Sequence, residues 1–377
     1  MRAFLRQRSY KNLNKVTVSK KTLLANHSAL QKFHPKTVVC PVLKSNAYGH
    51  GLKEVASIFD SMKCQFLVVD SLFEAYLLQK LRVRTPVLIL GYMLPSSFTA
   101  ERIPFDITLF DIESAKILNK HQPGCNIHIF VDTGMSREGV SIEDLPQFLT
   151  ELKKLKNLNV VGLCSHFADA DNPNSHQFTD LQVKTYKKAL AIVSKHGFSP
   201  KWRHISASAG TFKVHDQAFN MIRAGLAHYG INPLEGGDDH RKNITLHPVL
   251  EFSSTLVQVK KIQKGARIGY NGTYRAEKTM ILGLLPAGYY EGVDRRLSNK
   301  GYVKIRDQFF PIVGRVSMNM TVIDITKLKQ PKVGESVIIY SSKESDQNSI
   351  TNAAKQASTI PYELLVHIAD SVKRVII

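Results

Sequence analysis

The sequence predicts an α/β fold in which an N-terminal (β/α)8 barrel of the TIM type precedes a C-terminal, mainly β domain. Between about residues 36 and 230, short β-branched runs alternate eight times with amphipathic or capped helical stretches. A doubly wound open sheet would show the same alternation. The polar residues favour the barrel, because they follow the ends of different runs, and such ends converge on one mouth in a barrel. After about residue 240, the pattern changes to closely spaced strands and turns.

Each element of this prediction rests on a local pattern. The barrel strands are expected near residues 37–43, 65–70, 86–91, 105–110, 126–132, 159–165, 202–206 and 221–228. The helical stretches between them include residues 52–62, 72–81, 112–119, 142–155 and 178–196. The polar residues at the ends of the runs are Lys44, Asp70, Asp132, His166, Ser208 and Arg223. Later strands are expected at residues 250–262, 279–285, 301–305, 309–313, 321–325 and 335–340. We therefore expect a barrel domain over residues 12–240 and a β-rich domain over residues 241–377.

Composition excludes several classes of protein. Hydrophobic residues make up 43% and charged residues 22% of the 377 residues, so disorder is not predicted. The net charge of +20 is spread along the chain without a zinc-finger or RNA-binding signature, so we expect no nucleic-acid partner. The four cysteines occur singly and without histidines at metal-ligand spacing, which predicts reduced thiols and no metal site. No apolar run reaches the roughly 20 residues of a membrane span, and we expect a cytoplasmic protein.

Lys44 is a candidate catalytic lysine. It directly follows the run 37–43, which is too apolar for a solvated face. We therefore expect the Lys44 side chain to emerge from a buried strand into a cleft. Desolvation there would lower its pKa from about 10.4, as Schiff-base chemistry with a carbonyl cofactor requires. A lysine that reaches into solvent from a strand end is the alternative.

Three segments resemble motifs of the alanine racemase family. Residues 42–51, VLKSNAYGHG, resemble the segment whose lysine carries pyridoxal phosphate (PLP). Residues 222–230, IRAGLAHYG, resemble the segment whose arginine faces the pyridine nitrogen of PLP. Residues 267–274, RIGYNGTY, resemble the segment that supplies a second base. The resemblance covers about residues 15–370 and implies PLP as the cofactor, which serves as a sink for the charge of an α-carbanion.

The resemblance implies catalytic roles for four residues. Lys44 would act as a base on one face of the substrate, and Tyr270 on the opposite face. Tyr270 needs its pKa of about 10 tuned by neighbours, and His166 matches the histidine that contacts this tyrosine. Arg223 would face the ring nitrogen. Because arginine does not release its proton, it would leave that nitrogen unprotonated and weaken the sink, which favours racemisation over other reactions.

Further roles follow from the same resemblance. The cofactor-binding residues would be Lys44, Tyr48, Ser208, Arg223, Gly225, Leu226 and Tyr229. The residues that bind the substrate or narrow its entrance would be Arg137, Met318, Tyr289 and Tyr362, with Arg295 and Arg315 further out. Packing is the alternative role for Tyr289 and Tyr362.

Three residues depart from the family pattern. Phe130 replaces a lysine, often carbamylated, that braces the neighbouring arginine, so we expect Arg137 to lack this brace. Asn319 replaces an aspartate and removes a negative charge near the entrance, which could alter the substrate range. Ala207 replaces the asparagine that precedes the serine of this segment.

These observations predict a PLP-dependent alanine racemase that provides D-alanine for peptidoglycan precursors. A racemase of broader amino-acid specificity is the nearest alternative. A fold-related decarboxylase would carry an acidic residue where Arg223 stands, and a non-catalytic PLP-binding protein of a single barrel would lack the second domain. We also expect a homodimer in which Lys44 of one subunit and Tyr270 of the other share an active site, because the two bases lie in different domains.

Overall fold

Short runs of Val, Ile and Leu form the parallel strands that the sequence predicts. The computed structural model describes residues 11–99, 101–173, 176–234 and 236–377. Within these residues the chain divides into two compact units. The barrel unit comprises residues 22–48 and 52–246, and the β unit comprises the chain up to residue 21 with residues 49–51 and 247–377.

The described part of the barrel unit contains eight parallel strands. They are β2 (Val38–Pro41), β3 (Leu67–Val69), β4 (Val87–Ile89), β5 (Asp106–Leu109), β6 (Cys125–Phe130), β7 (Leu158–Cys164), β8 (Trp202–His204) and β9 (Met221–Ala224). Strands β3 to β8 pair in chain order, and β2 pairs with β9. The Leu43 amide donates to Val68 O at 2.7 Å and the Arg223 amide to Ser206 O at 3.0 Å, which joins the β2–β9 pair to both ends of the sheet. The (β/α)8 barrel is therefore confirmed, and every strand overlaps a run that predicted it.

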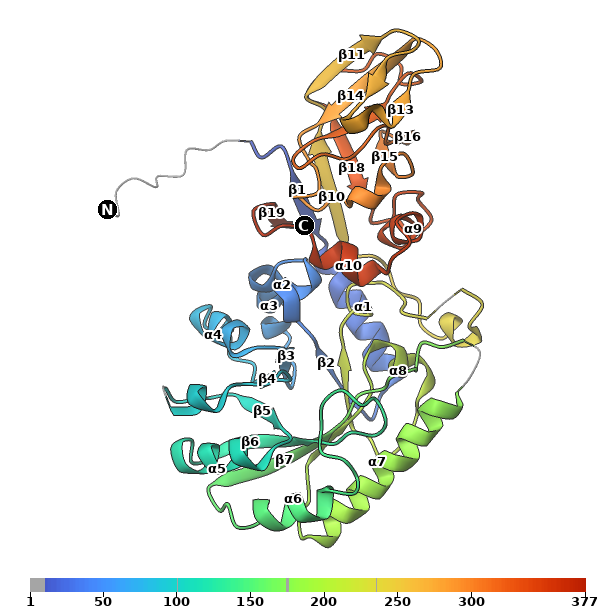
Figure 1. Cartoon of the computed structure of the whole chain (residues 1–377). Helices are drawn as coiled ribbons and strands as arrows, with labels where there is room; N and C mark the ends of the chain where they lie inside the picture. Colours follow the sequence, from blue (N-terminus) through green and yellow to red (C-terminus); the bar gives the residue numbers. More distant parts are fainter. Residues whose placement is uncertain (1–10, 100, 174–175, 235) are drawn as a thin grey trace, which may run out of the picture. The chain divides into compact units, whose positions relative to one another are not determined.

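Helices alternate with these strands and lie outside them (Figure 1). They are α1 (Lys20–Phe33), α3 (Leu52–Ser61), α4 (Leu72–Lys80), α5 (Ile112–His121), α6 (Leu145–Leu152), α7 (Gln177–Lys195) and α8 (Ser208–Lys213), with short 3-10 turns η1 (Pro95–Thr99) and η2 (Asp239–Lys242). Side-chain caps fix where two of them begin. Ser71 Oγ accepts from the Glu74 amide at 3.3 Å, and Asp111 Oδ1 accepts from the Ser114 amide at 2.7 Å.

Two clusters of buried apolar side chains hold the strands and helices together. One cluster joins the strands to each other and contains Cys40, Val42, Phe66, Val68, Leu88, Trp202 and Met221. The other packs α1 and α8 against β2 and β9, through Leu30, Val39, Phe212 and Ile222 among others. Burying such a side chain stabilises the fold by roughly 1.5–3 kcal/mol relative to leaving it exposed. The strands that carry the polar residues of the mouth are therefore held in a packed core.

The β unit contains the closely spaced strands that the sequence predicts. Its strands are β1 (Lys15–Val18), β10 (Leu250–Thr255), β11 (Gln258–Ile262), β12 (Arg267–Ile268), β13 (Tyr274–Arg275), β14 (Met280–Leu285), β15 (Tyr302–Ile305), β16 (Gln308–Pro311), β17 (Thr321–Asp324), β18 (Ser336–Tyr340) and β19 (Lys373–Ile376). A sheet of order β16-β15-β18-β10-β1-β19, a sheet of order β11-β14-β17 and the β12–β13 pair use them all. Two helices, α9 (Ile350–Gln356) and α10 (Pro361–Val366), and two 3-10 turns, η3 (Tyr270–Gly272) and η4 (Arg295–Leu297), complete the described elements.

The first strand of the described chain belongs to the β unit rather than to the barrel. In β1, Val16 pairs with Phe252 of β10 in antiparallel orientation, and Lys15 pairs with Lys373 of β19 in parallel orientation. The buried side chains of Val16 and Val18 face the sheet core. The structure thus groups this strand with the β unit, whereas the predicted barrel domain begins at residue 12, because a pattern along the sequence does not reveal pairing with residues more than 200 positions away.

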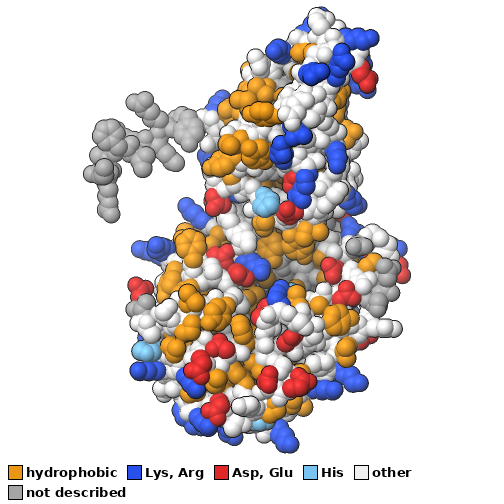
Figure 2. All heavy atoms as spheres, in the orientation of Figure 1, with side chains coloured by type: hydrophobic (Ala, Val, Ile, Leu, Met, Phe, Trp, Pro, Cys, Tyr) orange, Lys and Arg blue, Asp and Glu red, His pale blue; other side chains and the backbone are white. Residues whose placement is uncertain are grey.

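Two surface properties complete the description. No helix in the described ranges is long and apolar enough to cross a bilayer. Figure 2 shows Lys and Arg side chains spread over both units on the face drawn, interspersed with acidic and hydrophobic side chains. On this face the positive charge is therefore distributed rather than gathered in one patch.

Candidate active site

The loop after β2 holds Lys44 in an unusual backbone conformation. Lys44 begins the short turn α2 (Lys44–Tyr48), in which residues Ser45 to Tyr48 all have positive φ, from 52° to 55°. A left-handed turn costs roughly 1–2 kcal/mol for each residue other than glycine. Such strain persists only where surrounding contacts hold it, and it is concentrated at functional sites. The loop therefore marks the mouth of the barrel at Lys44 as a candidate site.

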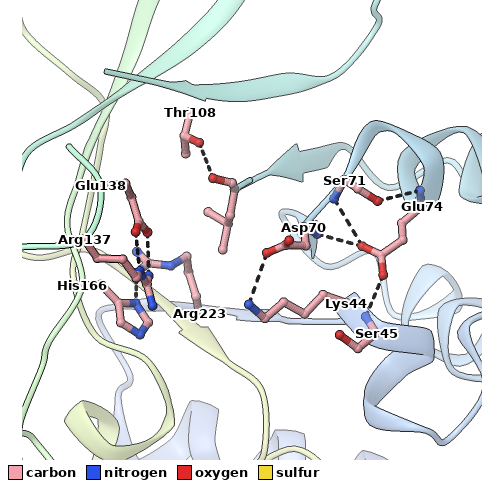
Figure 3. A network of polar contacts seen from close by, with 11 residues as sticks. Lys44, Ser45, Asp70, Ser71, Glu74, Thr108, Arg137, Glu138, His166 and Arg223 are labelled. Carbon is pink, nitrogen blue, oxygen red and sulfur yellow. Dashed lines mark hydrogen bonds and ion pairs between the residues drawn. The ribbon is translucent and has the colours of Figure 1, made fainter. Parts of the chain in front are cut away.

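Glu74 supplies part of the restraint on this loop. Its carboxylate accepts the amides of Ser45 at 2.6 Å, of Asp70 at 2.9 Å and of Ser71 at 3.3 Å (Figure 3). The same side chain completes the capping box of α4. Sequence reasoning missed this role, although the pattern Ser71-x-x-Glu74 is the signal of a capping box. Glu74 thus joins the start of α4 to the lysine loop.

Lys44 lies at the end of a buried strand, as predicted, but it is not fully desolvated. Leu43 before it is fully buried, whereas 39% of the Lys44 side chain is exposed. Its Nζ donates to Asp70 Oδ1 at 3.2 Å, at the end of β3. Exposed ion pairs of this kind contribute only about 0–1 kcal/mol. The pair orients Lys44 without locking it, so the amine is available to another partner.

A cavity of about 340 Å³ brings together four of the six polar residues predicted at the barrel mouth, whereas Asp132 and Ser208 do not line it. It is lined by Lys44, Asp70, Leu90, Gly91, Tyr92, Phe110, Phe130, Arg137, Glu138, His166 and Arg223. Lys44, Arg137, His166 and Arg223 come from segments far apart in the sequence, and Figure 3 shows them around one space. The convergence expected at the carboxyl ends of barrel strands is therefore observed.

Arg223 is buried in this cavity wall. Its side chain is 2% exposed, and its Nη2 donates to Ser165 O at 2.7 Å and contacts His166 Nδ1 at 3.1 Å. Its Nη1 donates to His204 Nδ1, and no described residue accepts a hydrogen bond from Nε. Buried polar atoms are almost always hydrogen-bonded, so an unused donor in a cavity wall indicates a place for an acceptor on a ligand. Burial lowers the pKa of Arg223, but arginine remains a donor only.

His166 is held neutral by its surroundings. Burial, followed by the nearby charges of Arg223, Arg137 and Lys44, lowers its pKa to about 3. Its Nδ1 faces a donor, Arg223 Nη2, and therefore acts as an acceptor. His166 thus contacts Arg223, and its predicted contact with Tyr270 stays a prediction.

A second group of predicted residues forms a loop beside β9. Ser208 Oγ accepts the amides of Gly225 at 3.0 Å and of Ala227 at 3.2 Å. The rings of Tyr48 and Tyr229 lie 5.2 Å apart, and a Cβ on Gly225 would stand 2.3 Å from Tyr48 Oη. Only glycine fits that position. Backbone amides and hydroxyl groups thus gather beside β9, where they bond to one another or to the backbone, as the Tyr229 hydroxyl does to Val42 O at 2.9 Å. Groups of this chemistry suit an anion such as a phosphate.

Arg137 has a carboxylate partner that the sequence analysis did not foresee. Its Nε and Nη2 both donate to the adjacent Glu138, Nη2 to Oε1 at 2.5 Å, and this pairing raises the pKa of Arg137. Phe130 leaves Arg137 without the lysine brace, as the sequence analysis expects, and Glu138 is the partner that holds Arg137 instead. Phe130 is buried in the cavity wall, and Glu138 provides the two-point contact that fixes a guanidinium. The acidic residue directly after Arg137 was the available signal.

The other two departures from the family pattern also have local explanations. Asn319 Nδ2 donates to Glu291 Oε1 at 2.8 Å, whereas an aspartate here would place two carboxylates in contact. Ala207 precedes α8 in an extended conformation and offers no side-chain cap. Its carbonyl instead accepts both the amide and the hydroxyl of Thr211.

The β unit positions the remaining predicted residues. Tyr270 begins η3 (Tyr270–Gly272), is 67% exposed and lines a cavity of about 560 Å³. Gly269, Ser317, Met318, Asn319 and Met320 line the same cavity. The Tyr289 amide donates to Ser317 O at 3.0 Å, which places it beside Met318. Tyr270 and Met318 are therefore brought together on one exposed, partly apolar surface.

Three entrance residues lie outside that cavity. Tyr362 is on α10, Arg295 begins η4 (Arg295–Leu297), and Arg315 follows the turn at Gly314. None of them is among the described residues that line the Tyr270 cavity. Their predicted roles at the substrate entrance stay predictions.

Solved structures share this architecture. The alanine racemase of Clostridium difficile matches with a TM-score of 0.91 and 28% identity, over 98% of this chain and 97% of that chain. The alanine racemase of Bartonella henselae, described with covalently bound pyridoxal phosphate, matches with a TM-score of 0.83 and 23% identity, over 97% of this chain and all of that chain (100%). Barrel and β unit together thus have the fold of a two-domain racemase.

The sequence comparisons lead to the family. A profile described as "Alanine racemase, N-terminal domain" matches residues 18–233, and one described as "Alanine racemase, C-terminal domain" matches residues 249–376. The alanine racemase of Leptospira interrogans is 30% identical over 371 residues, which cover 96% of this chain and 95% of that protein. The chain belongs to the alanine racemase family.

Buried neutral histidines predict a loss of stability in acid. His166 and His228 have pKa values of about 3 in the folded protein, below 6.5 in the unfolded chain. Below pH 6.5 the unfolded state binds more protons, so the free energy of unfolding falls as pH decreases towards 3. At pH 5 the difference is 1.5 units (6.5 minus 5), or about 2 kcal/mol for each histidine.

Urea unfolding at pH 7.5 and pH 5.0 checks this. The wild type should lose stability between these values, and His228→Gln should lose about 2 kcal/mol less, because glutamine does not titrate. The exposed His121 supplies the control, and His121→Gln should follow the wild type. Equal losses in all three proteins would contradict the prediction.

Proposed function

We propose that this protein is a PLP-dependent alanine racemase that interconverts L-alanine and D-alanine, and that it supplies D-alanine for peptidoglycan precursors. The observation that carries the proposal is the cavity at the barrel mouth, where Lys44, Arg137 and Arg223 converge in a chain of the alanine racemase family. A primary amine and two guanidinium groups in one cavity suit a carbonyl cofactor and anionic groups.

The residues of the mouth fit PLP. The unused Nε of Arg223 offers a donor to a ring nitrogen, and Gly225 lies so close to Tyr48 Oη that only glycine fits beside this predicted phosphate ligand. Lys44 would hold the cofactor covalently. The phosphate of the cofactor would lie against Tyr48, Ser208, Gly225, Leu226 and Tyr229. When bound, PLP supplies an electron sink that lowers the energy of a carbanion at the α-carbon.

Arg223 determines which reaction such a site favours. Its guanidinium cannot give up a proton, so it would donate to a ring nitrogen that stays unprotonated. The electron sink would then be weaker than with an acidic partner at this position. A weaker sink would favour prompt return of a proton to the α-carbon, and thus racemisation over transamination or decarboxylation.

Two bases would move the proton on opposite faces of the α-carbon. We assign one face to Lys44 Nζ and the other to Tyr270 Oη. A base must lie within about 3 Å of the proton that it abstracts, so the two atoms must flank the same carbon. Asp70 holds Lys44 Nζ while the lysine is charged, and His166 accepts from Arg223 rather than carrying a charge itself.

Arg137 is proposed to bind the substrate carboxylate. Glu138 fixes its Nε and Nη2, which leaves Nη1 to donate to a ligand. We assign the backbone amide of Met318 to the same carboxylate. Tyr289 and Tyr362 would narrow the entrance, which suits a side chain as small as the methyl group of alanine.

The decisive experiment combines an assay with a chemical label. Purified protein should racemise L-alanine in preference to L-serine, L-lysine and L-arginine. Borohydride reduction with PLP should place the pyridoxyl label on Lys44, and Lys44→Ala should lower kcat by about a thousandfold or more. Lys53, exposed on α3, provides the control, and Lys53→Ala should keep full activity. A label on another lysine would overturn the assignment, and equal rates with the larger substrates would support a broader-specificity racemase instead.

Glu138 provides a second test. Glu138→Gln removes the charge that holds Arg137, so the KM for alanine should rise several-fold while the PLP content stays unchanged. The matched control is Glu151→Gln on α6, which removes an exposed ion pair between Glu151 and Lys154 and should leave KM unchanged. A wild-type KM in Glu138→Gln would show that the carboxylate does not position Arg137.

We further propose that the active enzyme is a homodimer with shared sites. Lys44 and Tyr270 are 226 positions apart (270 minus 44) and belong to different units. The exposed surface around Tyr270 and Met318 is partly apolar and suits a protein partner. A two-fold axis would create two sites, each with the lysine of one subunit and the tyrosine of the other. We place the enzyme in the cytoplasm, which agrees with its four free cysteines.

Mixing two inactive variants tests the shared site. Lys44→Ala and Tyr270→Phe homodimers should each have almost no activity. After subunit exchange, half of the dimers are mixed and half of their sites are intact, so about a quarter of the wild-type activity should return. Heterodimers without any activity would place both bases in the same chain.

A further inference from the structure

A chain of buried polar groups extends from Arg223 across the inside of the barrel. His204 ends β8, His128 lies in β6, and Asp106 begins β5. Both histidine side chains are fully buried, and the side chain of Asp106 is 13% exposed. Neither the sequence motifs nor the cavity lining includes these three residues. They nevertheless connect to the one arginine that the proposed reaction requires at the ring nitrogen.

The contacts follow one another from strand to strand. Arg223 Nη1 donates to His204 Nδ1. His204 Nε2 lies 2.8 Å from His128 Nδ1, and His128 Nε2 lies 3.4 Å from Asp106 Oδ2. The other oxygen of Asp106 accepts from Asn126 Nδ2 at 3.0 Å. The contact between His128 and Asp106 is the longest of the three. Asn126 holds the Asp106 carboxylate through its other oxygen.

The direction of every hydrogen in this chain is determined by its first member. A guanidinium can only donate, so His204 Nδ1 carries no hydrogen. A neutral His204 must then carry its hydrogen on Nε2 and donate it to His128 Nδ1. By the same argument, His128 carries its hydrogen on Nε2 and donates it to Asp106, which can only accept when ionised. Protonation of either histidine would bring two hydrogens face to face inside the barrel.

The electrostatics of the barrel interior agree with this assignment. Burial, followed by the charge of Arg223, lowers the pKa of His204 well below its ordinary value. Burial also lowers the pKa of His128, and this outweighs the opposite effect of Asp106. Both imidazoles are therefore neutral, as the hydrogen directions require.

The imidazole of His128 is closely packed on two sides. Gly162 on β7 has no side chain, and a Cβ there would stand 2.0 Å from His128 Nδ1. The Phe66 ring packs edge-on against the imidazole, with 6.0 Å between the ring centroids. This packing restrains the ring in the orientation in which Nδ1 faces His204. This fixes the acceptor that Arg223 Nη1 requires.

We propose that Asp106, acting through His128 and His204, is a positioning residue that aims Arg223 Nε at the ring nitrogen of the cofactor. The inference rests on the proposed function and deepens it. Asp106 selects the tautomer of His128, His128 selects that of His204, and His204 holds Nη1. With Nη2 on backbone oxygen, the plane of the guanidinium is set and Nε is left for the ligand. A small misalignment of such a group can lower a rate by as much as about a hundredfold.

The first arm of the test reads the tautomers in protein without cofactor. Long-range 1H–15N spectra of histidine-labelled protein, assigned through His128→Gln and His204→Gln, should show both rings neutral with the hydrogen on Nε2. Asp106→Ala should change the His128 signal, and Asp106→Asn should restore it, because an amide oxygen can still accept. A charged ring, or a hydrogen on Nδ1 of either ring, would overturn the proposal whether or not the protein is a racemase.

The second arm measures the holoenzyme. Asp106→Ala should lower kcat for alanine by about tenfold, with KM and PLP content within about twofold of wild type, and Asp106→Asn should recover most of the loss. The matched control is Thr108→Val, because Thr108 lies on β5 as Asp106 does. The substitution removes the hydrogen bond from the buried Thr108 hydroxyl to Leu90 O and should only lower stability. Wild-type kcat in Asp106→Ala, or an equal fall in kcat in the control, would reduce Asp106 to a structural role and overturn the proposal.

Discussion

The buried guanidinium of Arg223 is the group on which the rest of the barrel mouth depends. Removing a charge from water costs several kcal/mol even after relaxation, and arginine cannot avoid that cost by losing its proton. Among the described residues, no carboxylate bonds to this guanidinium; the backbone oxygens of Ser165 and Ile205 and the rings of His166 and His204 do so instead. Acceptors are therefore required around it. Burial and this one permanent charge together keep both imidazoles that contact it neutral.

The other charges of the mouth are arranged differently. Lys44 pairs with Asp70 and Arg137 with Glu138, so each of these cations has a carboxylate within reach. Counted over the described residues that line the cavity, three cations face two carboxylates, and the excess positive charge is that of Arg223. A cavity with one sign of charge in excess concentrates ligands of the opposite sign. The site therefore favours ligands that carry phosphate or carboxylate groups, while its paired cations remain ordered before a ligand arrives.

The sequence predicted the scaffold better than it predicted the contacts. The alternation of apolar runs and helices located the barrel strands, and barrel topology then brought Lys44 and Arg223 to one mouth. The adjacent positions of Arg137 and Glu138 are visible in the sequence, but whether the two side chains turn towards each other is decided only in the structure. Nothing in the sequence distinguishes His128 from other strand residues. Its contact with His204 depends on the register of neighbouring strands, which the sequence does not give. The left-handed turn Ser45–Tyr48 could not be predicted, because residues other than glycine disfavour positive φ angles. Contacts with residues distant in the sequence, such as Glu74, maintain it.

The pairing of β1 with β19 has a consequence for the order in which the protein can fold. Synthesis proceeds from the N-terminus, so β1 exists long before its neighbours. Its partner positions Lys15 and Lys373 are separated by 358 residues (373 minus 15), and the amide of Lys20 donates to the carbonyl of Ile377. The barrel has all its strands once residue 224 has been made, whereas the main sheet of the β unit must wait for the last residues of the chain. Contacts of such long range are slow to form and leave strand edges open in the meantime. Even after β10 has been made and has paired with one edge of β1, the other edge stays open until β19 exists, and a chaperone or a second nascent chain could bind there.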